Sequence, residues 1–332
     1  MWAILCLVAL SDLAWALTRS PGVYQLTSPI DHGEGPTWDP RKGVLYYVDI
    51  HSGTILSYEH CSGKTHSISL YGDVTPILPS KNEKLFYVGL NRSLVALEWD
   101  GKNNVGKQTI LATVSPEYPH SRFNDGKTDK RGRLWIGTMG YENASGVQPD
   151  EGILYQFTKE NHEKPTPIIA PVNISNGLAW NKKNDKFYYI DTPTQKVVQY
   201  DYDDEKGEIK NKKVIFDLKD QIHVTGYPDG MTIDEDDNLW IALYMGGAII
   251  KVNPVTGKLL QVVAIPAQAV TSLTWGGPKL DILYVTTSRY PFSSEERKRQ
   301  PAAGALFAVT DLGTRGLPAF EADILNEPLK LK

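Results

Sequence analysis

Four short segments of this chain place an oxygen-bearing side chain directly before a glycine. They are Glu34-Gly35, Asn124-Asp125-Gly126, Asn176-Gly177 and Asp229-Gly230. Each segment lies about ten residues ahead of an aromatic-rich run, so the four recur at one phase of a repeating unit. Carboxylate and amide oxygens are the ligands that hard divalent cations prefer, and glycine lets a backbone approach an ion closely. The segments therefore predict one converging oxygen-donor site.

The ordinary interpretation of Asn-Gly, Asp-Gly and Glu-Gly pairs is a turn between strands. Any one of the four pairs, taken alone, fits that interpretation. All four stand beside a predicted strand instead of at a hairpin tip, and all four share one phase. The shared phase favours a common site over four separate turns.

The aromatic-rich runs belong to a longer series that determines the predicted fold. Six such runs begin at Leu45, Leu85, Leu134, Phe187, Leu239 and Leu283, about 40 to 53 residues apart. A period of this length is typical of a propeller or a solenoid. Each run is followed some ten residues later by a second apolar or alternating run, and no stretch keeps helical apolar spacing over three turns. We predict an all-β fold, a six-bladed β-propeller with four short strands in each blade.

The repeat also decides the domain organisation. A length of 332 residues would suit two domains, but blades that bury their faces only against neighbours cannot be divided into independent halves. We predict one propeller domain over residues 17–332. Its ring should close by pairing of an early strand, residues 22–27, with the last blade.

The N-terminus resembles a secretion signal. The first ten residues, MWAILCLVAL, are apolar, and the sequence AWA at residues 14–16 supplies the small-x-small pattern that signal peptidase cleaves. We expect residues 1–16 to be a signal peptide and the protein to be secreted. An uncleaved leader is the alternative, because no Lys or Arg precedes the run and Asp12 interrupts it. The run is too short to span a bilayer.

Secretion would have two further consequences. Cleavage would remove Cys6 and leave Cys61 without a partner, so no internal disulfide could form. The sequons at Asn91, Asn143 and Asn173 would become available for glycosylation, which would make the protein a glycoprotein. We expect Asn91 to be the best acceptor, because a glycan on Asn173 would crowd Asn176.

Charge excludes some classes of partner. The formal net charge is −4, which creates no field that would attract nucleic acid or anionic lipid. We expect neither nucleic acid nor a membrane as a partner, and we expect a monomer.

The propeller would bring the four donor segments together. In such a fold the innermost strands run along a central channel, and we expect the donors in the loops that ring one mouth of it. Two carboxylates, Glu34 and Asp229, with the amides of Asn176 and Asn124 form an all-oxygen set that suits Ca²⁺, Mg²⁺ or Mn²⁺, with water in the open positions. The second and sixth repeats carry only uncharged residues at this phase, which leaves one side of the ion open for substrate.

Other chemistries find little support in the sequence. The acidic clusters at residues 201–208 and 234–238 lack the glycine and glutamate positions of an EF-hand, and we interpret them as solvated hairpin turns. No Gly-x-Ser-x-Gly elbow and no glycine-rich phosphate loop occurs. His32 and His120 flank the donor motifs and could transfer protons, although a histidine in a surface loop is the ordinary interpretation.

Several longer motifs closely resemble the SMP-30/gluconolactonase/regucalcin family. They are GEGPTWD, RFNDGKTDKRGRLWIGTM, ISNGLAW, GYPDGM and RQPAAGALFAVTDLG, and the resemblance runs from about Gly33 to Gly316. It implies a six-bladed propeller with one divalent metal in its channel and lactone hydrolysis as the activity. By position, the metal ligands would be Glu34, Asn176 and Asp229, and the substrate-binding residues would be Arg122, Asn124 and Glu142.

Three residues in or beside these motifs have more than one interpretation. Asp125 is expected either to orient Asn124 or to cap the turn. Glu142 stands in a glycine-containing connection, residues 139–152, of the kind that forms an active-site lid. Tyr141 departs from the acidic residue common in animal relatives, which puts substrate preference in question.

The expected cofactor is one divalent cation, Ca²⁺ first, with Zn²⁺, Mn²⁺ or Mg²⁺ as alternatives, and the expected partner is a small-molecule sugar lactone. The cation would polarise the lactone carbonyl, and Asp229 would take a proton from the attacking water. Glu34 could share that role, because a carboxylate bound to a cation is a weakened proton acceptor. The alternatives are an organophosphate or other ester hydrolase on the same metal site, and a non-enzymatic extracellular calcium-binding protein.

Overall fold

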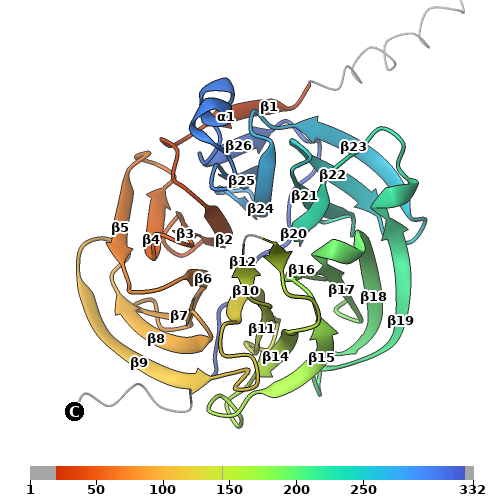
Figure 1. Cartoon of the computed structure of the whole chain (residues 1–332). Coiled ribbons are helices and arrows are strands. Elements are labelled where there is room, and N and C mark those ends of the chain that lie inside the picture. Colours follow the sequence, from red (N-terminus) through yellow and green to blue (C-terminus); the bar gives the residue numbers. More distant parts are fainter. Residues whose placement is uncertain (1–19, 144, 326–332) are drawn as a thin grey trace, which may run out of the picture.

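The computed structural model describes residues 20–143 and 145–325. These residues form six four-stranded antiparallel sheets around a central channel (Figure 1). The six-bladed all-β prediction is therefore confirmed. The expected signal peptide, residues 1–16, lies outside the described residues.

Each blade contains four strands, counted outward from the channel. Blade one is β2 (Gly33–Asp39), β3 (Val44–Asp49), β4 (Thr54–Glu59) and β5 (Thr65–Ser69), and blade two is β6 (Val74–Pro79), β7 (Leu85–Leu90), β8 (Ser93–Trp99) and β9 (Val105–Thr113). Blade three is β10 (Arg122–Thr128), β11 (Leu134–Met139), β14 (Gly152–Phe157) and β15 (Thr166–Val172), and blade four is β16 (Ser175–Trp180), β17 (Lys186–Asp191), β18 (Lys196–Asp203) and β19 (Glu208–Asp217). Blade five is β20 (Tyr227–Ile233), β21 (Leu239–Tyr244), β22 (Ala248–Asn253) and β23 (Lys258–Ala264). Blade six is β24 (Ala269–Gly276), β25 (Ile282–Ser288), β26 (Phe307–Thr310) and β1 (Gly22–Gln25).

The aromatic-rich runs are the second strands of the blades, where they pack between neighbouring blades. Every residue of β3 and of β11 is buried, whereas the outermost strand β5 alternates between exposed and half-buried residues. Trp135 and Trp240 are fully buried. Burying a large apolar side chain contributes roughly 1.5 to 3 kcal/mol, so the core is distributed around the ring.

The N-terminal strand closes the ring as predicted. β1 pairs antiparallel with β26, with Gly22 opposite Thr310 and Gln25 opposite Phe307. Blade six is therefore built from both ends of the described chain. On the channel side, the Thr271 hydroxyl donates to the Gly33 carbonyl at 2.6 Å, which joins the inner strands of blades six and one.

All six inner strands carry an irregularity at the same place. The register of the inner strand against the second strand shifts between Glu34 and Thr37, Val74 and Ile77, Phe123 and Gly126, Asn176 and Leu178, Pro228 and Met231, and Val270 and Ser272. Such a β-bulge leaves a residue unpaired and redirects its side chain. Beyond the bulge, pairing is regular to the end of each inner strand.

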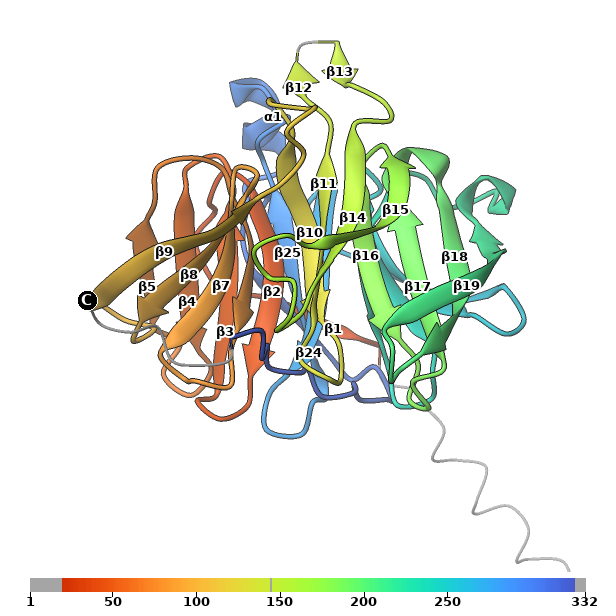
Figure 2. The ribbon, with the colours of Figure 1, turned by 90° about the horizontal axis from the view of Figure 1, so that it is seen from below.

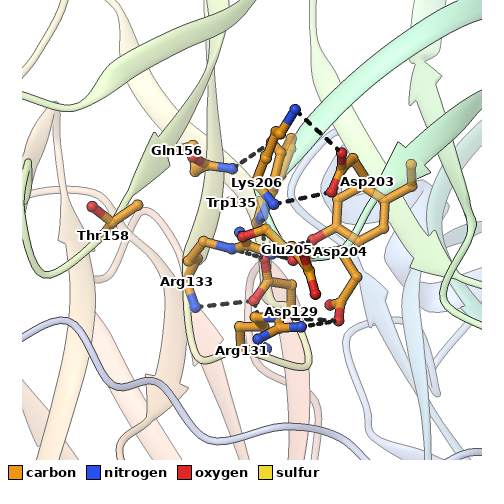
Figure 3. Close-up of polar contacts among 12 residues, drawn as sticks. Asp129, Arg131, Arg133, Trp135, Gln156, Thr158, Asp203, Asp204, Glu205 and Lys206 are labelled. Atoms are coloured by element: carbon orange, nitrogen blue, oxygen red, sulfur yellow. Dashed lines mark hydrogen bonds and ion pairs between the residues drawn. The ribbon is translucent and has the colours of Figure 1, made fainter.

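Buried aspartates hold the turns after two inner strands. Asp129 accepts hydrogen bonds from Arg133 Nε at 2.6 Å, from Trp135 Nε1 at 2.9 Å and from the Tyr202 hydroxyl at 2.9 Å. Figure 3 shows how Arg133 links Asp129 to the turn at residues 203–206 of blade four. Breaking a buried pair of this kind costs about 3–5 kcal/mol.

The prediction of a solvated turn at residues 234–238 was wrong for Asp234. This carboxylate is fully buried and accepts from Trp240 Nε1 at 3.0 Å, and it pairs with Lys251 at 2.8 Å. Asp234 is buried because the Trp240 indole nitrogen would otherwise be buried without an acceptor.

The two faces of the ring differ. The hairpin of β12 (Glu142–Asn143) and β13 (Gly146–Val147) projects from the face of the ring that also carries α1 (Ser294–Arg299), as Figure 2 shows. A C-terminal segment crosses the opposite face. Its Gly316 forms a β-bridge with Asp234 of blade five, and its Ala322 forms one with Ser80 of blade two. No helix within the described residues is long and apolar enough to cross a membrane.

Candidate metal and active site

The donor residues lie inside the inner strands, not in the loops ahead of them as we predicted. Glu34 is the second residue of β2 and Asn176 the second residue of β16, while Asn124 and Asp229 are the third residues of β10 and β20. Each donor stands at or within the bulge of its strand. The bulge supplies the change of side-chain direction that we had assigned to a loop.

The glycines beside the donors allow the inner strands to approach one another. A Cβ atom on Gly177 would lie 2.7 Å from the Met231 Cβ and 2.8 Å from the Asp229 carbonyl oxygen. A Cβ atom on Gly230 would lie 2.0 Å from the Ser272 Oγ. Both contacts are too short for any side chain, so these glycines set the distance between blades at the height of the site.

Three carboxylates are buried together at this height. Burial and the charge of Asp125 raise the pKa of Glu34 to about 8, and the Gly35 N–H and Arg122 oppose the rise only in part. Burial, Glu34 and Asp125 raise the pKa of Asp229 well above its usual range. Burial also raises the pKa of Asp125. The cluster therefore repels itself when it is ionised.

Asn176 presents an unpaired oxygen in the same cluster. Its Nδ2 donates to the Thr192 Oγ1 at 2.8 Å, and that hydroxyl donates its own proton to the Pro228 carbonyl at 2.8 Å. Because the single Thr192 proton is used, the hydroxyl must accept from Asn176, which fixes the orientation of the amide. The Asn176 Oδ1 is buried and has no hydrogen-bond partner.

These residues fit a divalent cation. The Asn176 amide oxygen is buried without a donor, and the Glu34 and Asp229 carboxylates have raised pKa values. A bound cation would satisfy the oxygen and stabilise the charged form of both carboxylates. Among residues 20–143 and 145–325, no three His, Cys, Asp or Glu side chains form a ligand group by themselves. A cation here would therefore need the Asn176 amide in addition to Glu34 and Asp229.

The two blades without charged donors support their neighbours. Thr75 donates its hydroxyl proton to the Asn124 carbonyl at 2.7 Å, and Thr271 donates to the Gly33 carbonyl. Their side chains are thus used to hold the backbone of adjacent donor strands. This arrangement agrees with the expectation that blades two and six supply no charge.

Arg122 and Asn124 lie together beside the carboxylates. An Arg122 guanidinium nitrogen donates to the Asn124 Oδ1 at 2.9 Å, and the Asn124 Nδ2 donates to the Ser175 carbonyl at 2.9 Å. The guanidinium also lies 3.6 Å from Asp73 and 3.8 Å from Glu142. The structure therefore joins the three predicted substrate-binding residues, with the exposed Glu142 on the projecting hairpin.

A histidine cluster at the same mouth includes one predicted residue and others that we missed. The rings of His32 and His51 are 5.2 Å apart, and His51 lies 4.2 Å from the Tyr290 ring and 3.2 Å from an Asp73 oxygen. Burial and the neighbouring His51 lower the pKa of His32 well below its usual value. His51 directly follows the first aromatic-rich run, so its position at a strand end was a usable signal.

His120 belongs to a different environment. It is exposed, and its ring lies 5.4 Å from the ring of Tyr141. This contact connects the segment before β10 to the lid region. Asp125 has a capping role, because its Oδ1 accepts from the Gly126 N–H at 2.7 Å, and its buried Oδ2 has no partner. Its charge also acts on Glu34 and Asp229.

Comparison with known proteins places this geometry in a family. A family model described as the SMP-30/gluconolactonase/LRE-like region matches residues 32–289. Regucalcin from Homo sapiens is 34% identical over 289 residues, which cover 87% of this chain and 93% of that protein. The structure of a luciferin-regenerating enzyme superposes with a TM-score of 0.86 at 34% identity, covering 92% of this chain and 100% of the other.

A more distant structure has the same fold. A regucalcin from Agrobacterium tumefaciens, described as a calcium-binding protein, superposes with a TM-score of 0.80 at 23% identity, covering 90% of this chain and 96% of the other. The matched region contains all six predicted site residues. The chain therefore belongs to the SMP-30/gluconolactonase/LRE-like family, as its motifs predicted.

Proposed function

We propose that the protein is a metal-dependent lactonase that opens sugar lactones. The observation that carries the proposal is the unpartnered, orientation-fixed Asn176 oxygen beside the buried Glu34 and Asp229 carboxylates. Membership in a family that includes gluconolactonases supports the choice of a lactone as substrate. The Arg122, Asn124 and Glu142 group beside the cluster supports turnover instead of cation storage alone.

Glu34, Asn176 and Asp229 would hold the cation, and Ca²⁺ is the proposed ion because the set is all oxygen. The description of the Agrobacterium relative as a calcium-binding protein agrees with this choice. When bound, a divalent cation polarises a carbonyl oxygen and stabilises the negative charge that develops there.

The protein's own residues would orient the substrate and accept a proton. The Arg122 guanidinium lies 3.6 Å from Asp73 and 3.8 Å from Glu142, which is too far for a hydrogen bond to either. Its remaining donors can therefore bind a ring hydroxyl or the lactone oxygen. The Asp229 carboxylate would take a proton from water, although binding to the cation weakens it as a proton acceptor. Asp125 is placed to share this role, because its Oδ2 is free and it is not one of the proposed ligands.

Chelation tests the proposal directly. Protein treated with EDTA should lose glucono-lactone hydrolysis by at least roughly a hundredfold and recover it with Ca²⁺. Protein treated with calcium-saturated EDTA is the matched control and should keep full activity. Full activity in protein shown to be metal-free would overturn the mechanism.

A substrate panel separates the alternatives. We expect a higher kcat/KM for aldonolactones than for aryl lactones or an organophosphate triester. A reversed order would favour the organophosphate or ester hydrolase. Tight Ca²⁺ binding without turnover of any member would favour a non-enzymatic calcium-binding protein.

We also propose that the protein is secreted and monomeric. The apolar N-terminal run supports secretion, and the free Cys61 agrees with the expectation of a chain without an internal disulfide. Asn91, the preferred glycosylation site, is exposed, whereas the Asn173 Nδ2 donates to Asp191 at 2.8 Å. Mass spectrometry of protein recovered from culture medium should find an N-terminus at residue 17 and a glycan on Asn91.

A further inference from the structure

A cavity lies at the end of the channel opposite the candidate metal site. It has a volume of about 290 Å³, and every inner strand contributes to its wall. Each blade contributes at least one wall residue from its inner strand; in order from blade one to blade six, these include Thr37, Leu78, Thr128, Ala179, Thr232 and Thr274. The C-terminal segment at residues 317–320 forms another part of the wall, because it crosses this face between blades five and two.

This cavity is separate from the candidate metal site. Asn176 and Trp180 lie four residues apart on β16, which corresponds to roughly 13 Å along a strand. Trp180 lines the cavity, and Glu34, Asn176 and Asp229 do not. The irregular halves of the inner strands therefore carry the metal site, and the regular halves carry the cavity.

The charged residues of the cavity all have one sign. Lys127, Lys130 and Lys182 line it, and no aspartate or glutamate does. The Lys127 ammonium donates to the Met231 carbonyl across the channel, and Lys182 Nζ donates to the Glu235 carbonyl at 3.3 Å. Both partners are neutral main-chain oxygens, and Asp125, whose charge also acts on Lys127, lies outside the wall.

Two donors in the wall have no acceptor. Trp180 and Thr128 are each 7% exposed, and neither the Trp180 indole nitrogen nor the Thr128 hydroxyl has a hydrogen-bond partner. Buried polar groups in proteins are normally paired, because an unpaired group keeps its full desolvation cost. Both side chains belong to the wall of the cavity, but the two polar atoms are themselves covered, so a ligand would reach them only after the wall moves.

We propose that this cavity binds a small organic carboxylate with an apolar body. The body would pack against Leu317, Pro318 and Phe320 of the C-terminal segment, and the carboxylate would accept from the lysine ammonium groups. Charge-assisted hydrogen bonds of this kind are about twice as strong as neutral ones. A neutral molecule of the same length would gain only the apolar contacts.

Octanoate is a suitable probe, and octanol is its uncharged match. Calorimetric titration of the calcium-loaded full protein should give one octanoate site, with octanol at least roughly tenfold weaker. The double variant Lys130→Gln/Lys182→Gln should weaken octanoate roughly tenfold without changing octanol binding. Both lysines are exposed, so the melting temperature should stay that of the wild type. Lys212→Gln, at an exposed lysine outside the cavity, is the control.

A second variant tests the wall itself. Leu317→Ala shortens a half-buried apolar side chain of the wall, and it should weaken octanoate and octanol alike, by roughly threefold to tenfold. Equal affinity for octanoate and octanol would overturn the proposal, as would no octanoate binding at about 10 mM. Binding that survives Lys130→Gln/Lys182→Gln but disappears in Asp229→Asn would also overturn it, because the ligand would then occupy the metal site.

Discussion

The two ends of the channel are built from the same six strands but carry opposite charge. One end buries Glu34, Asp125 and Asp229 with a single nearby arginine, and the other is lined by three lysines without a carboxylate. The difference coincides with a difference in backbone. The acidic end contains the bulges of the inner strands, whereas the basic end has regular pairing.

The comparison teaches how one scaffold separates two tasks. A bulge directs side chains out of the regular alternation and crowds like charges, which is unfavourable until a cation neutralises them. Regular pairing keeps the alternation, so the basic end exposes two of its lysines and buries apolar groups at little electrostatic cost. Changes of Glu34 or Asp229 should therefore leave ligand binding at the basic end unaffected, whereas Asp125 and Lys127 act on each other across the two ends.

The largest expected effect is at the acidic end. Asp229→Asn should lower kcat/KM for glucono-lactone by roughly a hundredfold to a thousandfold and weaken Ca²⁺ binding in calorimetry. Octanoate binding at the basic end should not change. Asp236→Asn, at an exposed position of the turn after β20, is the control. Activity near the wild-type level in Asp229→Asn would remove this residue from the mechanism.

The next largest effect tests how the acidic end is organised. Thr192→Val removes the hydroxyl that fixes the Asn176 amide, and loss of such support typically weakens a metal site roughly tenfold to a hundredfold. Ca²⁺ affinity should fall by that amount. Thr194→Val in the same short helical turn is the control and should bind Ca²⁺ normally. Unchanged affinity in Thr192→Val would mean that the amide orients itself without the hydroxyl.

A smaller effect should separate substrate binding from cation binding. Arg122→Lys keeps the charge but removes the planar fork of donors, so KM for the lactone should rise about tenfold. Ca²⁺ affinity should be unchanged, because Arg122 is not a proposed ligand. Arg315→Lys, at a surface pair with Glu235, is the control. A loss of Ca²⁺ affinity in Arg122→Lys would contradict the assignment.

The smallest effects concern stability and have opposite signs at the two ends. In metal-free protein the pKa of Glu34 is about 8 against 4.5 in the unfolded chain, so the folded state holds the extra proton between these values. Stability should therefore fall as pH rises from 4.5 to 8. Melting curves should show a shift of a few degrees, reduced in Glu34→Gln and opposed by Ca²⁺.

The basic end should behave in the reverse manner. Burial lowers the pKa of Lys127 from 10.5 to about 8, so the unfolded chain holds the extra proton between these values. Stability should gain a contribution as pH rises from 8 to 10.5. Lys127→Met should lose that contribution, which is measured as the difference between its melting curves and those of the wild type. Parallel pH profiles for the two proteins would contradict the shift.

The sequence predicted the six-bladed propeller but not the β-bulges that position the donor side chains. The period of the aromatic runs is a local signal that each blade repeats, and the pairing of β1 with β26 followed from it. The bulges could not be predicted, because a register shift is defined by the opposite strand. The donors were therefore placed in loops although their convergence was correctly anticipated.

Other failures had signals that went unused. Asp129 and Asp234 each stand six residues before a buried tryptophan, Trp135 and Trp240, whose indole they accept from. That repeated spacing distinguishes a structural aspartate from a solvated turn. The basic cavity had no such signal, because its wall requires the C-terminal segment to cross between two distant blades.

The closure of blade six has a consequence for biosynthesis. The first described strand, β1, has no partner until the ribosome has made Phe307–Thr310, so the ring cannot close before these residues are synthesised. Every donor through Asp229 is synthesised before that moment. A premature stop before residue 307 would thus leave both β1 and the edge of β25 unpaired, a state that favours aggregation. A stop codon shortly before residue 307 should therefore be as damaging as one in the first blade.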